Sequence, residues 1–521
     1  MVFRLIIITC LFFYYCSIPN GRSEVYSYKI KQFVNSWQSN QTIQYPADEF
    51  EIQALIKHAY QQGSTIIRVI GSGHSYEKAI SDEQDINAEQ KLMLVSLEKY
   101  HGVTIDKENN VAIVKAGTFI GPNPEVGNKD IKKSLVWILN QVGYAVPDLA
   151  GITRQTVAGF LSTGSSGGSL LYSFYDVLVG IRLIDGKGTI HNIYKQDSKF
   201  HAVGISMGLF GIITSVNISL MTKSFYVDGS ETISPIVPPS SNFSVGCPID
   251  IFGDGNQQYP SLTKFFKTGA DFSRLIWYPQ KDVDRSVIWK ASKYDRKPFP
   301  PIVPYQQFSE TNLTAVSMQI ADAFTIMNML AADTEEYYSL VNSIFDQLQP
   351  IGKQEFFDIY YNSLPMDNHL SFKILPISFT ELWIPIEKTK EVMNILRNYY
   401  LTHGVNATGN NALEIYTSGK SHFWLSPSYS TDAVRFDWYW FDNNPIGTAQ
   451  NFFQQFWDLL KPFEYRCHWG KYLPDDYNGH RLHKLYPMLE EWLKIRNEMD
   501  PEQVFVTSYW RKIFSIKKLE K

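Results

Sequence analysis

The apolar positions of the chain alternate between helical and strand spacing from residue 42 to residue 220. Residues 50–63 carry apolar side chains at helical spacing and end at a glycine, so they predict an amphipathic helix. Residues 64–70 are largely apolar and predict a buried strand. Residues 103–117 and 181–193 each have the pattern strand, polar turn, strand, which predicts two hairpins. This order favours an α+β unit over a doubly wound parallel sheet.

A change in composition divides the chain. Residues 230–250 are rich in Pro, Ser and Gly, which favours a domain boundary near them. Aromatic-rich strand patterns, such as residues 432–441, then alternate with helical patterns. The 521 residues exceed the roughly 250–300 that one hydrophobic core serves. We therefore predict two packed α+β domains, residues 38–225 and residues 226–521.

The N-terminus has the pattern of a targeting segment. Arg4 precedes an apolar run from Leu5 to Tyr15, which as a helix would be about 16 Å long, half the thickness of a bilayer core. Residues 1–22 therefore predict a secretory signal peptide, with a retained membrane anchor as the alternative. N-glycosylation sequons stand at Asn40, Asn217, Asn242, Asn312 and Asn406. They agree with a secreted protein or a protein of the secretory lumen.

Charge and cysteine content narrow the class of ligand. The 48 basic and 52 acidic residues give a net charge of −4, so nothing favours binding to nucleic acid or to an anionic membrane surface. Two of the four cysteines lie in the leader, which leaves Cys247 and Cys467. This number excludes a disulfide scaffold and a cysteine-ligated zinc site, while one disulfide stays open. We expect a small-molecule ligand and no metal.

Two glycine-rich turns carry the candidate chemistry. The first, in IIRVIGSGHSY, places Tyr76 where a dinucleotide fingerprint requires a third glycine or alanine, which argues against a Rossmann fold. The second, residues 155–170, lacks the Gly-Lys-Ser/Thr of a nucleotide-hydrolysing loop. Two such turns about 90 residues apart, each expected after an extended segment, can grip one pyrophosphate cofactor from two sides. The second also matches G-x-S-x-G with Ser166 as nucleophile, so a serine hydrolase is an alternative.

The pair of turns resembles the FAD-binding domain of the vanillyl-alcohol oxidase type, also called the PCMH type. The resemblance implies FAD as cofactor, with His74 as the site of covalent attachment to the flavin 8α-methyl. The runs DGKGTIHNI and SMGLFGIIT are similar to later elements of the same domain. The expected cofactor-binding residues are Ile70, Gly71, Ser72, Gly73, His74, Ser75, Thr156, Gly159, Thr163, Gly164, Ser165, Ser166, Gly167 and Ile213.

The C-terminal part resembles the sugar-1,4-lactone and alditol oxidases. RCHWGKYLP has the His-Trp-x-Lys motif of that family, and residues 495–510 are similar to its closing segment. The resemblance implies that Lys471 lies near the flavin N1–C2 carbonyl or binds a substrate oxygen. In a regular strand Trp469 and Lys471 share a face and His468 points away, which leaves His468 open between a structural and a catalytic role.

At two positions the sequence differs from the family that it resembles, and at a third its residue is one of two that the family uses. In ALEIYTSG, Glu414 stands where the family holds substrate hydroxyls, but Tyr416 replaces its arginine and cannot supply a guanidinium fork. Ser166 stands where many relatives have a histidine. Ala150 occupies a position where alanine resembles forms that react poorly with oxygen.

The resemblance implies an FAD-dependent oxidase of two α+β domains. Its substrate would be the alcohol carbon of a sugar 1,4-lactone or polyol, with hydride passing to flavin N5. Oxygen, giving hydrogen peroxide, or another electron acceptor would complete the cycle. The candidate catalytic residues are Lys471, Glu414, Tyr416 and His468. The alternatives are an oligosaccharide oxidase of the same fold and a glycosylated binding protein without turnover.

Overall fold

The computed structural model describes residues 43–519, with gaps at 82–84, 86–90, 123–130, 238–244, 308–312, 330–333, 369, 371–373, 410–411, 443 and 445–446. The expected leader, residues 1–22, lies outside the described residues, as do the sequons at Asn40, Asn242 and Asn312.

The first half of the chain forms two small sheets. A parallel sheet has the order β1-β3-β2, and an antiparallel sheet has the order β4-β5-β8-β6-β7. The strands are β1 (Ile43–Gln44), β2 (Thr65–Ile70), β3 (Lys91–Ser96), β4 (Val103–Asp106), β5 (Val111–Lys115), β6 (Leu178–Asp185), β7 (Ile190–Tyr194) and β8 (Gly211–Ser219). The helices are α3 (Glu49–Gln62), α5 (Leu135–Gln141), α6 (Val157–Ser162) and α7 (Phe200–Val203). Both predicted hairpins are confirmed, as β4–β5 and β6–β7.

Helix α3 follows from its local sequence. The Asp48 side chain caps it by accepting a hydrogen bond from the Glu51 amide, and Gly63 ends it at φ 61°, a conformation that glycine adopts without strain. Ile52 and Ile56 are buried on one face, as the helical spacing predicts.

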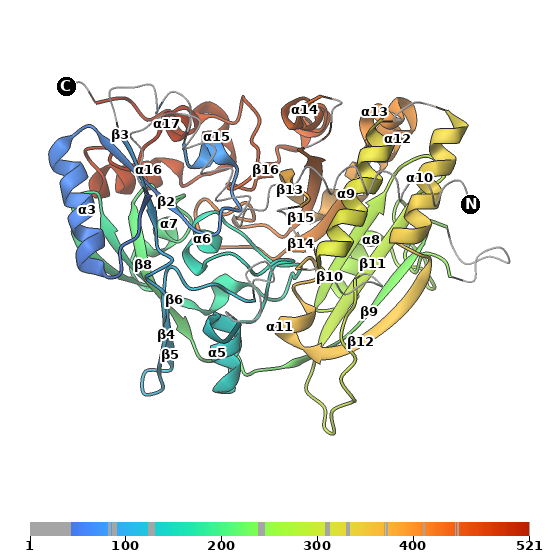
Figure 1. Cartoon of the computed structure of the whole chain (residues 1–521), viewed down its shortest axis with the longest axis horizontal. Coiled ribbons are helices and arrows are strands. Elements are labelled where there is room, and N and C mark those ends of the chain that lie inside the picture. The colour runs from blue at the N-terminus through green and yellow to red at the C-terminus, as the bar shows by residue number, and fades with distance from the viewer. Residues whose placement is uncertain are drawn as a thin grey trace, which may run out of the picture.

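The second half is built on one eight-stranded sheet of order β12-β9-β11-β10-β14-β15-β13-β16 (Figure 1). The strands are β9 (Tyr226–Pro235), β10 (Phe272–Tyr278), β11 (Arg285–Tyr294), β12 (Gly352–Ile359), β13 (Ile377–Pro385), β14 (Leu413–Ser418), β15 (Ala433–Phe441) and β16 (Arg466–Cys467). The helices of this half are α8 (Leu262–Thr268), α9 (Leu313–Met329), α10 (Glu335–Leu348), α11 (Tyr360–Ser363), α12 (Thr389–His403), α13 (Val405–Thr408) and α14 (Ala449–Leu460). The predicted α+β fold is confirmed.

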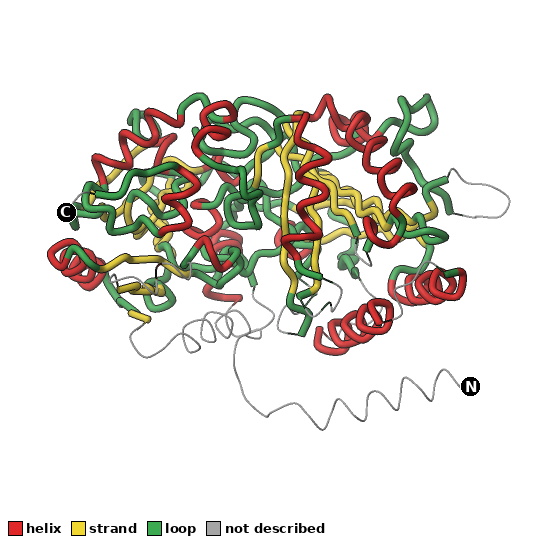
Figure 2. Tube along the Cα trace, turned by 90° about the horizontal axis from the view of Figure 1, so that it is seen from above, coloured by secondary structure: helices red, strands yellow, loops and turns green. Residues whose placement is uncertain are grey.

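The two faces of this sheet have different partners (Figure 2). Helices α8, α12 and α14 contribute buried residues to the main core together with Ile415 of β14 and Phe436 of β15. Helices α9 and α10 form a separate hydrophobic cluster with residues of the opposite face, including Ile377 and Tyr439. Because strand side chains alternate between faces, Glu414 and Tyr416 point away from the main core. This second face forms a wall of the candidate site.

The C-terminal segment returns to the first half. It contains α15 (Gly479–Leu485), α16 (Leu489–Met499) and α17 (Ser508–Phe514). The Ile67 amide of β2 donates to the Val504 carbonyl at 2.7 Å, and the Trp510 indole donates to the Ala79 carbonyl at 2.8 Å. In Figure 1 these late helices lie beside α3 and β2, which are among the first described elements. The first half is therefore completed by residues from the end of the chain.

Cys247 and Cys467 are buried free thiols, so they do not form the disulfide that the sequence left open. Among the described residues, none of the helices combines the length and the apolar character needed to cross a bilayer.

Candidate active site

The first glycine loop begins where β2 ends at Ile70. Gly73 has φ 80°, which favours glycine, and a Cβ on Gly71 would lie 2.6 Å from the Thr156 hydroxyl oxygen. Glycine at position 71 therefore lets this loop approach the start of the second glycine-rich segment.

The second glycine-rich segment, residues 155–170, contains a short helix. Thr156 caps helix α6 by accepting a hydrogen bond from the Gly159 amide at 3.3 Å. Gly164, at φ 75°, then turns the chain after the helix. The residues before this segment, 143–154, contain no helix, and the helix inside the segment is a feature that the sequence analysis did not predict.

Both loops line one cavity of about 530 Å³, which also reaches the second face of the large sheet. The predicted site residues on it are Ile70, Gly71, Ser72, Gly73, His74, Ser75, Thr156, Gly159, Thr163, Ser165, Ser166, Gly167, Ile213, Glu414, Tyr416, His468 and Lys471. Gly164 is absent from this lining; a Cβ there would meet the Pro427 ring at 3.0 Å. The structure thus brings residues from both ends of the chain to one cavity.

Three carboxylates lie in one row across the sheet. Glu414 of β14 pairs directly with Asp437 of β15, which in turn pairs with Glu381 of β13. Adjacent in-register residues have Cβ atoms about 5 Å apart, so these side chains share one patch of the cavity wall. We call these three residues the carboxylate row.

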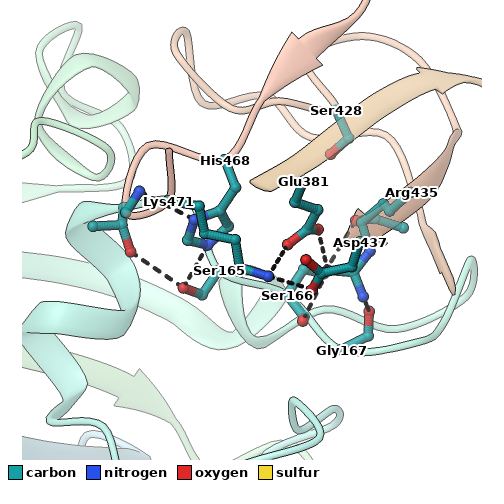
Figure 3. A network of polar contacts seen from close by, with 12 residues as sticks. Ser165, Ser166, Gly167, Glu381, Ser428, Arg435, Asp437, His468 and Lys471 are labelled. Atoms are coloured by element: carbon teal, nitrogen blue, oxygen red, sulfur yellow. Dashed lines mark hydrogen bonds and ion pairs between the residues drawn. The ribbon is translucent and has the colours of Figure 1, made fainter. Parts of the chain in front are cut away.

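Lys471 forms ion pairs with two members of the carboxylate row (Figure 3). Its ammonium lies 2.7 Å from Glu381 Oε2 and forms a second, shorter ion pair with Asp437. Only 19% of its side chain is exposed, so the pair is shielded from solvent. Lys471 is therefore held in one place by two carboxylates that the sequence did not indicate.

His468 and Lys471 belong to a turn, not to a regular strand. Strand β16 ends at Cys467, and the Lys471 amide donates to the His468 carbonyl at 3.1 Å. Both side chains line the cavity, while Trp469 is fully buried and donates to the Leu425 carbonyl at 2.7 Å. The strand alternation predicted for this motif was wrong, because the turn brings residues three apart to the same side.

Burial and charge separate the pKa values of the acidic groups. Burial, with the Asp367 charge, raises the pKa of Glu414 to about 8, and burial raises that of Asp437 to about 7. Burial also raises the pKa of Glu381, but Lys471 and Arg435 overcome this effect and lower it to about 2. The row thus combines one firmly ionised carboxylate with two that exchange protons near neutral pH.

Two arginines flank Tyr416 on the neighbouring strands, although residue 416 itself is not an arginine. Tyr416 pairs with Arg274 on one side and with Arg435 on the other. The Arg274 guanidinium lies 3.5 Å from Glu414 and pairs with Asp367, and Arg435 lies 3.2 Å from Glu381. Neighbouring strands therefore place guanidinium groups on either side of the phenol.

Arg435 also connects the sheet to the second glycine loop. Its guanidinium donates to the Ser166 carbonyl at 3.2 Å and to the Gly167 carbonyl at 2.8 Å. The carboxylate row and the second loop are thus held together by one side chain.

The serine contacts do not form a hydrolytic triad. Ser166 Oγ lies 3.1 Å from Ser418 Oγ, whereas His468 Nε2 contacts Ser165 Oγ at 3.0 Å. His468 Nδ1 accepts from the Gly470 amide at 3.1 Å, so a neutral ring carries its proton on Nε2. Burial lowers the pKa of His468 to about 3, which keeps it neutral. A ring in this tautomer cannot take a proton from a serine.

His74 and Ala150 both line the cavity. Burial and the positive charge of Arg154 lower the pKa of His74 to about 3. A neutral imidazole keeps a nitrogen lone pair, which nucleophilic attack requires.

The sequence reasoning missed Glu381, Asp437, Arg435, Arg274 and Asp367. A signal was present for the first three, since charged residues interrupt the strand-like runs FTELWIP and AVRFDWYWF. A charge inside such a run is rarely buried without a partner.

Comparison with known proteins shows what each half of the chain is similar to. The model described as FAD binding domain matches residues 41–194, and the model described as D-arabinono-1,4-lactone oxidase matches residues 257–513. Both matches support a flavoprotein with an FAD-binding domain of the vanillyl-alcohol oxidase type. The second half of the chain is thus similar to the sugar-1,4-lactone oxidases, in agreement with the resemblance seen in the sequence.

Two relatives illustrate the similarity. L-gulonolactone oxidase of Mus musculus is 21% identical over 509 residues, which are 94% of this chain and 100% of the relative. D-arabinono-1,4-lactone oxidase of Kluyveromyces lactis is 27% identical over 249 residues, 47% of this chain. That match spans only 39% of the yeast protein.

Solved structures share the fold. A cholesterol oxidase from Brevibacterium sterolicum has a TM-score of 0.67 at 13% identity, covering 91% of this chain and 94% of its own. The BBE-like 1 protein of Physcomitrella patens has a TM-score of 0.58 at 14% identity, covering 92% and 94%. Both support the two-domain α+β flavoprotein fold.

Proposed function

We propose that the protein oxidises the alcohol carbon of a sugar 1,4-lactone or polyol. The observation that carries this proposal is the carboxylate row with Lys471, placed on the same cavity as the two glycine loops. The likeness to lactone oxidases supports the substrate class.

The cavity residues fit FAD. The two glycine loops approach each other where a Cβ on Gly71 would meet Thr156, so backbone amides can reach a pyrophosphate from both sides. The first loop, Thr163–Gly167 of the second and Ile213 would hold the cofactor. Bound FAD supplies the acceptor for the hydride of the alcohol carbon. We further propose that the neutral His74 ring attaches covalently to the flavin.

The carboxylate row and its neighbours have distinct roles in the proposed reaction. Burial raises the pKa of Glu414 to about 8, so this carboxyl group can hold a proton and donate a hydrogen bond to one substrate oxygen. Asp437 accepts the hydroxyl proton, because its pKa of about 7 suits a general base. Lys471 holds a positive charge at the junction of the row and the glycine loops. Tyr416 and His468 shape the wall between them.

An absorption spectrum before and after acid precipitation tests the cofactor. Protein from a eukaryotic secretory host should keep its yellow colour in the acid pellet, and His74→Ala should release it. His58→Ala, which removes an exposed histidine of α3, is the matched control and should behave as wild type. Colourless protein from flavin-replete cells would contradict the oxidase assignment.

Anaerobic mixing with a panel of lactones and polyols tests the substrate. Loss of the yellow colour with a panel member, followed by equimolar hydrogen peroxide on admission of air, is the expected result. If only an artificial acceptor reoxidised the reduced flavin, the proposal of oxygen as acceptor would be overturned. Ala150→Gly should then raise the rate at which oxygen reoxidises the flavin. A panel without any bleaching of bound flavin would favour a binding protein.

We propose a secretory location from the leader and the sequons. Asn406 is exposed on α13, whereas Asn217 is half-buried in β8. Protein from the secretory host should therefore lose mass on deglycosylation, and Asn406→Gln should lose one glycan. An unchanged mass would remove the support that the sequons give.

A further inference from the structure

The cavity continues beyond the carboxylate row, and its wall changes character there. One step further along the same face of the sheet, Tyr439 of β15 pairs with Phe379 of β13. The next step pairs Phe441 with Ile377. From Asp437 to Phe441 is four residues, about 13 Å along a strand. The wall thus passes from charged to apolar over that length.

Two helices close this part of the cavity. Ile320 and Phe324 of α9 and Phe345 of α10 line it. Phe324 stacks on Phe441 with ring centroids 4.1 Å apart, and Phe345 packs against Tyr278 at 4.6 Å. We call the space between α9, α10 and these sheet residues the apolar chamber. Its hydrophobic cluster is separate from the main core.

The apolar chamber and the carboxylate row meet directly. The Lys471 ammonium lies 5.1 Å from the centroid of the Phe379 ring, and Tyr439 hydrogen-bonds to Glu414. A ligand whose hydroxyl contacts Glu414 or Lys471 is therefore within one strand step of aromatic surface.

This arrangement bears on the substrate. A sugar carries a hydroxyl on nearly every carbon, and a hydroxyl buried against apolar walls without a partner is unfavourable. An alkyl or aryl group in the same place is stabilised by leaving water. We infer that the substrate is an alcohol with two parts: one or two hydroxylated carbons at the carboxylate row, and an attached aliphatic or aromatic body in the apolar chamber. The inference rests on the proposed function, the oxidation of an alcohol carbon, and narrows its substrate to an alcohol that also carries an apolar body.

A homologous series of ligands tests this inference. The probes are propane-1,2-diol to heptane-1,2-diol, which present the same two hydroxyls with a growing alkyl body. Binding to the flavin-loaded protein is measured by calorimetry and by the rise in melting temperature, and anaerobic loss of flavin absorbance is recorded in parallel. The dissociation constant should fall about fourfold for each added methylene, on the order of 10²-fold over the series.

Two variants on adjacent residues of α9 locate the effect. Phe324→Asn places an amide in the apolar chamber. It should reduce the increase in affinity to less than about twofold per methylene. Thr325→Asn changes the exposed neighbour on the same helix and should keep the wild-type gain. The wild-type series decides the question by itself if Phe324→Asn does not fold.

Failure of the inference and failure of the proposed function give different results. A dissociation constant independent of chain length would overturn the inference, and bleaching by lactones in the same preparation would leave the proposed function standing. Tighter binding along the series without bleaching by any alcohol would support the apolar chamber and contradict the oxidase activity. If the affinity of Phe324→Asn rose as much per methylene as that of wild type, the alkyl body would lie outside the apolar chamber. This result would overturn the inference.

Discussion

Tyr416 and Arg435 are directly opposed across β14 and β15, with the guanidinium carbon 4.8 Å from the centre of the phenol ring. The family places an arginine where Tyr416 stands, and here the neighbouring strand supplies the guanidinium. Neighbouring strands lie about 4.8 Å apart, so the Arg435 guanidinium is one strand away from position 416. A positive charge therefore lies beside Tyr416, although the residue itself is neutral.

Arg435 should be sensitive to a conservative change. Arg435→Lys keeps the charge but loses the fork that reaches both loop carbonyls, and Arg435→Met leaves Glu381 without one of its cations. We expect Arg435→Met to lower the free energy of unfolding by about 3–5 kcal/mol. Arg435→Lys should lose less stability but bind FAD more weakly. Urea unfolding and flavin titration check both, and wild-type FAD affinity in Arg435→Lys would contradict the bridging role.

Lys471 should matter more for turnover than for cofactor content. Lys471→Met removes a fixed charge next to the carboxylate row, and loss of one such group costs about 10²–10³ in kcat. The colour of the protein should remain, because neither glycine loop depends on Lys471 for its backbone conformation. Lys264→Met, at an exposed lysine of α8, is the control. A kcat within about twofold of wild type would remove Lys471 from the catalytic residues.

Glu414 should make stability depend on pH. Its pKa is raised in the folded state, so its contribution to stability is complete below about pH 4 and is lost as the pH rises through about 8. The slope from one such group reaches at most about 1.4 kcal/mol per pH unit. Glu414→Gln stays neutral, so the fall in melting temperature between pH 5 and pH 8.5 should be smaller in this variant than in wild type. Glu108→Gln, in an exposed turn, should keep the wild-type slope.

Ser166→Ala should be nearly silent. Within the described part of the chain, the Ser166 hydroxyl hydrogen-bonds to the Ser418 hydroxyl alone, and a single such hydrogen bond contributes about 1 kcal/mol. Ser418→Ala removes the same contact from the other side and should have a similar effect. Flavin content and turnover are the measurements. Labelling of wild type by a fluorophosphonate, abolished in Ser166→Ala, would revive the hydrolase alternative.

The residues found from the sequence and those missed differ in a physical way. The glycine loops and the His-Trp-x-Lys motif are local, because each functional group stands within a few residues of the feature that marks it. Glu381, Asp437 and Arg274 come from three strands far apart in the chain, and they meet only through the strand order β10-β14-β15-β13. Spacing along a sequence does not specify which strands become neighbours. The alternation of faces within β15 was predictable; its pairing with β13 was not.

The return of the C-terminus to β2 has a consequence for how the protein is made. Arg68 donates to the Phe505 carbonyl across 437 residues of chain. At about 5–20 residues per second, a ribosome needs roughly 20 to 90 s to travel that distance. Throughout that time the first glycine loop and strand β2 lack the C-terminal residues, Val504 and Phe505, that hydrogen-bond to β2. A cofactor can therefore occupy the completed site only after the ribosome has synthesised these C-terminal residues.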